Sequence, residues 1–136
     1  MKKIIVIAAL VLCTHFCFAQ ISSVSMIRYV NAMETACRKC VGAGGNNIIN
    51  CENTFYTQMD SILNVSYLAL KKKMSRGDFD ILKMNQRVWL KERDNYFKQQ
   101  ESEIGKSGAG LEADKAQAIH QEALFVKDRV MYMLKR

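Results

Sequence analysis

Proline is absent from the whole chain, and its seven glycines fall at three places, residues 42–45, Gly77 and residues 105–110. Between these places Lys, Glu, Gln, Leu, Ala and Met are frequent, and these residues favour helix over strand. The three glycine-containing breaks therefore predict four helices, over about 22–40, 48–75, 78–103 and 111–134, with Asp78 as the cap of the third. Because 49% of the 136 residues are hydrophobic, the chain can bury a core. We expect an all-α, single-domain, four-helix bundle-like array that follows a cleaved signal peptide.

The first nineteen residues have the pattern of a Sec signal peptide. They read MKKIIVIAALVLCTHFCFA, with two lysines, an apolar stretch and small side chains at the −3 and −1 positions of a cleavage site after Ala19. The apolar stretch is short for a membrane anchor, and neither of its cysteines follows the small residue that a lipoprotein site needs. We expect residues 1–19 to be removed, and residues 20–136 to form a periplasmic or secreted helical domain without a stable membrane span.

Export would place Cys37, Cys40 and Cys51 in an oxidising compartment, where three cysteines give one disulfide and one free thiol. The spacing of Cys37 and Cys40 also occurs in redox and zinc sites, but the sequence offers neither a βαβ setting nor further ligands nearby. We interpret the cysteines as a staple. Cys37 paired with Cys51 would close a loop of about fifteen residues, worth roughly 3 kcal/mol, and Cys40 is the alternative partner of Cys51.

The chain is basic, with a formal net charge of +7 that becomes +5 when Lys2 and Lys3 leave with the leader. The run Lys71–Lys73 falls at the end of a predicted helix, where lysine complements the helix dipole. No nucleic-acid-binding motif accompanies the charge, so we expect no nucleic-acid partner.

Two predicted helices carry polar side chains at helical spacing. If the second and third helices pack antiparallel, Tyr67 falls near Gln86 and Asp60 near Arg93. A buried carboxylate and guanidinium are tolerated only when paired and hydrogen bonded. We therefore predict an interhelical clasp that fixes the register of the two helices, built on the motif residues Asp60, Leu63, Asn64, Tyr67, Gln86, Trp89, Arg93 and Asp94.

Catalysis finds no support in this pattern. Acid–base chemistry needs two groups that face one cavity, and neither Asp94 nor Glu92 shares the helix face of Asp60. The sequence identifies no partner for His120, and a lone histidine on a polar helix face is typical of the protein surface. The sequence contains no Ser-His-Asp order, phosphate loop or metal-ligand cluster, so we expect no catalytic residue, no metal and no cofactor.

The pattern Asp60-x-x-Leu63-Asn64-x-x-Tyr67-x-x-Leu70, followed by Gln86-x-x-Trp89-x-x-x-Arg93-Asp94, resembles the signature of the LprI-type lysozyme-inhibitor-like family of small exported bacterial proteins. Cys51 and Cys37 also stand where many members carry cysteines. The resemblance is best over residues 37–97, and Arg129 is a further anchor. Phe97 stands where the family usually has a cysteine.

This resemblance implies a helical binding protein whose partner is lysozyme or another peptidoglycan hydrolase. Host lysozymes are strongly basic, so an inhibitor profits from acidic surface, and Glu101 with Glu103 or Glu112 with Asp114 would supply it locally. The alternative is a structural or interaction protein of the bacterial envelope with no hydrolase-inhibiting activity. The pattern assigns no oligomeric state.

Overall fold

The structure is a computed structural model that describes residues 23–44 and 47–136. This described part consists of four helices and contains no strand: α2 (Ser23–Gly42), α3 (Ile48–Lys73), α4 (Arg76–Glu103) and α5 (Leu111–Leu134). The predicted all-α class and four-helix array are confirmed, and each helix boundary lies within two residues of its predicted position. The expected signal peptide, residues 1–19, lies outside the described residues.

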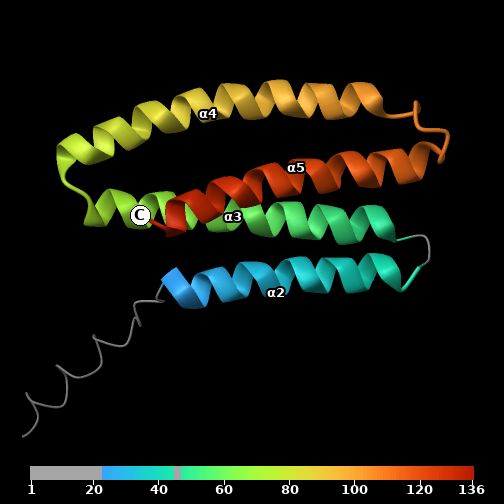
Figure 1. Cartoon of the computed structure of the whole chain (residues 1–136), viewed down its shortest axis with the longest axis horizontal. Coiled ribbons are helices and arrows are strands. Elements are labelled where there is room, and N and C mark those ends of the chain that lie inside the picture. The colour runs from blue at the N-terminus through green and yellow to red at the C-terminus, as the bar shows by residue number, and fades with distance from the viewer. Residues whose placement is uncertain (1–22, 45–46) are drawn as a thin grey trace, which may run out of the picture.

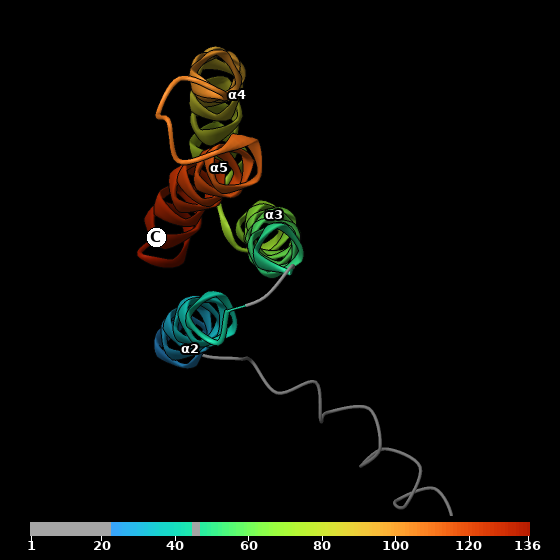
Figure 2. The ribbon, with the colours of Figure 1, turned by 90° about the vertical axis from the view of Figure 1, so that its right-hand side faces the viewer.

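The four helices form an array in which α3 and α5 are the central pair (Figure 1). Outside this pair, α2 packs mainly on α3 and α4 packs on α5. The end-on view in Figure 2 shows the same order, with α5 lying between α4 and α3. Because the connections reverse the chain at each break, α5 runs in the same direction as α3.

The core lies along the α3–α5 contact, where small side chains on α5 let the two helices approach closely. Ala123, Val126 and Val130 of α5 are completely buried, as is Met59 of α3. Apolar residues recur every three or four positions on each helix, so one face of each turns inward. The core also includes Val30, Phe55, Ile62, Leu63, Leu70, Leu82, Trp89 and Met133.

Helix α4 contributes little to this core. Its buried residues are Leu82 and Trp89, whereas Ile81, Met84 and Val88 are exposed on its outer face. The structure therefore holds α4 mainly along one narrow stripe that packs on α5.

The N-terminus of α4 is capped by Ser75 and not, as predicted, by Asp78. The Ser75 hydroxyl accepts a hydrogen bond from the Asp78 backbone N–H at 3.2 Å and donates to the Asp78 carboxylate at 2.6 Å. The cap lies earlier because the helix begins at Arg76, which places Asp78 inside the first turn, where its charge still complements the helix dipole.

The connection from α4 to α5 is organised by Asp114. Its carboxylate accepts hydrogen bonds from the backbone N–H groups of Gly105, at 2.7 Å, and Ser107, at 3.4 Å, and from the Ser107 hydroxyl. These bonds, first of all that of the hydroxyl, hold the pKa of Asp114 below its ordinary value. Gly105, Gly108 and Gly110 have positive φ angles, which glycine adopts readily.

None of the helices in residues 23–44 and 47–136 has the length and apolar character that crossing a membrane requires.

We expect Leu82→Ala to lower the free energy of unfolding by roughly 2–5 kcal/mol, because it leaves a cavity under α4. Leu82 is 1% exposed, whereas its neighbour Ile81 is 61% exposed. Ile81→Ala is the matched control and should change stability by less than about 0.5 kcal/mol. Urea unfolding of both variants checks this; equal losses would contradict the orientation of α4.

Candidate functional site

An open groove lies between α3 and α4, and most residues of the family-like signature line it. The groove has a volume of about 280 Å³, and we call it the α3–α4 groove. Residues at spacings of three and four share a helix face, which is why both helices present their motif residues to the same space. Its lining consists of Asp60, Leu63, Asn64, Tyr67, Lys83, Gln86, Arg87, Leu90 and Arg93.

Two aromatic pairs join α3 to α4, one near each end of the stretch that the signature residues occupy. Tyr67 contacts Phe79, with ring centroids 5.3 Å apart, and Tyr56 contacts Phe97 edge-on at 5.9 Å. Phe97, which stands where the resemblance predicts a cysteine, therefore contributes a ring contact between the helices. Together the two pairs keep α3 and α4 at a fixed separation, while the polar residues between them remain accessible.

The predicted clasp between Asp60 and Arg93 is not formed. Asp60 accepts hydrogen bonds from the Asn64 side-chain amide, at 3.3 Å to its carboxylate. Arg93 donates from Nε and Nη2 to Asp94, at 3.0 and 2.7 Å, and its guanidinium lies over the rings of Trp89 and Phe97. Both side chains thus find partners on their own helix, because α5 packs between the two helices and leaves a groove where a direct contact was predicted.

The interhelical clasp that does form joins α4 to α5 through Arg129, for which the sequence pattern predicts no contact. Its Nε donates to Gln86 Oε1 and its Nη2 to Asn85 Oδ1, both at 2.8 Å. Its guanidinium also lies 5.5 Å from the Trp89 ring and 4.6 Å from the Tyr132 ring. Burial lowers the pKa of Arg129 from its ordinary value, but a guanidinium remains charged at neutral pH. Gln86 and Trp89 therefore contact α5, whereas the sequence predicts that they contact α3.

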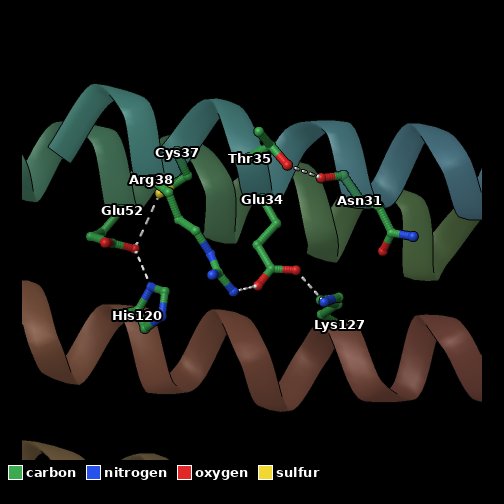
Figure 3. A network of polar contacts seen from close by, with 8 residues as sticks. All are labelled: Asn31, Glu34, Thr35, Cys37, Arg38, Glu52, His120 and Lys127. Atoms are coloured by element: carbon green, nitrogen blue, oxygen red, sulfur yellow. Dashed lines mark hydrogen bonds and ion pairs between the residues drawn. The ribbon is translucent and has the colours of Figure 1, made fainter. Parts of the chain in front are cut away.

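A second polar cluster lies where α2, α3 and α5 meet (Figure 3). Glu34 of α2 accepts from Lys127 of α5 and from Arg38 of its own helix. The hydrogen bond from Lys127 is the main reason that the pKa of Glu34 lies below its ordinary value. A lowered pKa means that this contact stabilises the fold above the pKa of the unfolded state and is lost as the pH falls through the folded-state value.

The same interface contains Cys37 and Glu52, which are buried, and His120, which is partly buried. The Cys37 thiol lies 3.4 Å from Glu52 Oε2, and His120 Nδ1 lies 2.9 Å from the same oxygen (Figure 3). Burial, and then the charge of Glu52, raises the pKa of Cys37 to about 12. The three residue types are those of a catalytic triad, but a protonated, buried thiol is a poor nucleophile. His120, expected at the surface, is instead a partly buried partner of Glu52.

The disulfide joins Cys40 and Cys51, the alternative pairing that the sequence left open, and the preferred pairing of Cys37 with Cys51 is wrong. Cys51 is bonded to Cys40, with 5.9 Å between the two Cα atoms, and Cys37 is free. Cys37 lies one helical turn earlier and points into the interface, where its thiol also donates to the Cys51 carbonyl at 3.6 Å. Cys40, at the end of α2, faces the start of α3. The shorter loop still contributes roughly 3 kcal/mol by the chain-entropy argument.

We expect iodoacetamide to leave Cys37 unmodified in the native, unreduced protein and to modify it in denaturant, because its thiol is buried and protonated. Trypsin cleaves after Arg38 and Lys39, so a peptide map separates Cys37 from Cys40. The map should show Cys40 linked to Cys51. Modification of Cys40 together with a link between Cys37 and Cys51 would contradict the structure.

Fold and site together define a small, disulfide-stapled, all-helical protein with an open groove lined mainly by polar side chains. Within the part of the chain that the structure describes, no three His, Cys, Asp or Glu side chains form a group that could hold a metal ion.

Comparison with known proteins agrees with this class. The family model described as "Lysozyme inhibitor LprI" matches residues 37–124, which is more than half of the chain. The protein therefore belongs to the LprI family. The matched region contains the disulfide, the groove and His120, and it ends before Arg129. The description of the family is that of an inhibitor. A search of curated proteins and a search of solved structures each gave no match.

Proposed function

We propose that this protein is exported and inhibits lysozyme or a related peptidoglycan hydrolase, with the α3–α4 groove as its binding surface. Membership of a family described as lysozyme inhibitors and the leader-like pattern of residues 1–19 support this proposal. It places the protein in the periplasm or outside the cell, where peptidoglycan and its hydrolases meet.

The observation that carries the proposal is the position of the signature side chains. Asn64 is exposed, and Asp60, Tyr67, Gln86 and Arg93 are only partly buried, so amide, phenol and charged groups meet at one accessible surface. Ligand sites typically combine apolar lining with a few polar groups that fix the orientation of the ligand, and Leu63 and Leu90 supply the apolar part here.

The acidic patches considered from the sequence are weaker candidates for the binding surface. The Asp114 carboxylate accepts hydrogen bonds from the Gly105 backbone N–H and the Ser107 hydroxyl. Glu103 forms an ion pair with Lys106 at 3.0 Å. Each patch therefore presents less free negative charge than the sequence predicts.

The alternative function is that of a structural or interaction protein of the envelope without inhibitory activity. The contacts of Gln86 and Trp89 favour this alternative. Both contact Arg129 and so stabilise the α4–α5 pair. In that case the signature would serve the fold, and substitutions of exposed groove residues would leave every assay of hydrolase activity unchanged.

We expect a molar excess of the purified protein to slow the clearing of bacterial cell walls by lysozyme. Arg87→Ala should raise the concentration needed for half inhibition about fivefold, the equivalent of losing one contact of roughly 1 kcal/mol. Arg28→Ala is the matched control, because Arg28 is also exposed but lies on α2, away from the groove. Unchanged clearing with every lysozyme type tested would contradict the proposal and favour the envelope alternative.

A further inference from the structure

The α3–α4 groove carries an excess of positive charge. Lys83, Arg87 and Arg93 line it together with a single carboxylate, that of Asp60. Arg93 is bound to Asp94 on its own helix. Within residues 23–44 and 47–136, however, no ion pair engages Lys83 or Arg87, and both side chains are exposed. Two cationic groups at the groove are therefore available to a ligand.

Lys83 and Arg87 lie four residues apart on α4, so they are neighbours on the helix surface. Like charges at this spacing repel each other and destabilise a helix, and an anionic ligand between them would remove that repulsion. Arginine binds a carboxylate through two parallel hydrogen bonds, and lysine binds it as a point charge. The geometry suits a ligand that bears carboxylates.

The rest of the lining suits an amide-rich or sugar-like ligand. Asn64 offers its side-chain oxygen, because its NH2 group is bonded to Asp60, and Tyr67 offers a phenol, while Leu63 and Leu90 supply apolar surface. A volume of about 280 Å³ is near the lower limit for small-molecule sites, so the groove can hold a short piece of a longer polymer.

We propose that the α3–α4 groove binds the carboxylate-bearing peptides of the anionic cell-wall polymer, so that the protein slows hydrolysis by covering the substrate. This proposal rests on the proposed inhibitory function and names the ligand of its site. A net charge of +7, or +5 without Lys2 and Lys3, repels a basic lysozyme, whereas the protein and the enzyme are both attracted to the same negatively charged wall. The positive charge of the protein therefore disfavours direct contact with the basic enzyme and favours contact with the anionic substrate.

A co-sedimentation assay tests the proposed ligand with the unaltered protein. The purified protein is mixed with insoluble peptidoglycan sacculi, or with sacculi whose carboxylates have been converted to neutral amides with a carbodiimide and an amine. We expect the protein to sediment with untreated sacculi and to bind at least about tenfold more weakly to the amidated ones, since the charge-assisted contacts are lost. Equal binding to both preparations, or no binding to untreated sacculi, would overturn the proposal.

A comparison of two lysozyme substrates distinguishes masking of the cell wall from direct inhibition of the enzyme. We expect the protein to slow lysozyme on sacculi and to leave unchanged its hydrolysis of a soluble chito-oligosaccharide, which has no carboxylates. Equal slowing on both substrates would overturn the masking proposal while supporting the inhibitory function. No slowing on either substrate would overturn both.

A pair of charge-reversed variants assigns the binding to the groove. Lys83→Glu combined with Arg87→Glu should weaken binding to sacculi by at least about tenfold. Arg28→Glu combined with Lys39→Glu changes the net charge equally, but on exposed positions of α2, at the opposite edge of the array from α4 (Figure 1). This control should bind within about twofold of the unaltered protein. Equal weakening by both variants, at unchanged melting temperatures, would show a general charge effect and overturn the assignment to the groove.

Discussion

The packing of α5 against α3 determines where every other helix lies. The small and β-branched residues Ala123, Val126 and Val130 allow α5 to approach α3 closely, and they are completely buried. The face that α4 turns toward α3 carries Lys83 and Arg87, and burying unpaired charges would be costly. Helix α4 therefore packs its narrow apolar stripe on α5, and a groove remains between α3 and α4.

In this arrangement the residues of the family signature have two different roles. Trp89 and Gln86 hold α5 through the buried guanidinium of Arg129, so they secure the helix that keeps the groove open. Asp60 and Asn64, across the groove on α3, bond to each other and leave the space between the helices free. A signature that resembles a core-facing clasp in the sequence thus lines an open groove in the fold, which we propose as the binding surface, with Lys83 and Arg87 as its unpaired cations.

Helical period and glycine breaks predicted the four helices closely, because both are local properties. They identify the apolar face of each helix but do not determine which helix packs on it, so the pairing of Asp60 with Arg93 was wrong although both residues line one groove. For a similar reason the sequence left two partners for Cys51 and favoured Cys37, which is not the one bonded. Spacing makes Cys37 and Cys40 equivalent, and what distinguishes them is that Cys37 is buried against α3, where its thiol contacts Glu52 and the Cys51 carbonyl. Arg129 and the Glu52–His120 pair depend on contacts between distant segments, which no local pattern predicts.

The signature residues line an open groove and form no clasp across it. A double-mutant cycle on Asp60→Ala and Arg93→Ala, measured by urea unfolding, distinguishes these two arrangements. Because Asp60 bonds to Asn64 and Arg93 bonds to Asp94, we expect a coupling energy below about 0.5 kcal/mol. A coupling energy above roughly 1.5 kcal/mol would mean that the two side chains pair across the groove and that the groove is closed by a clasp.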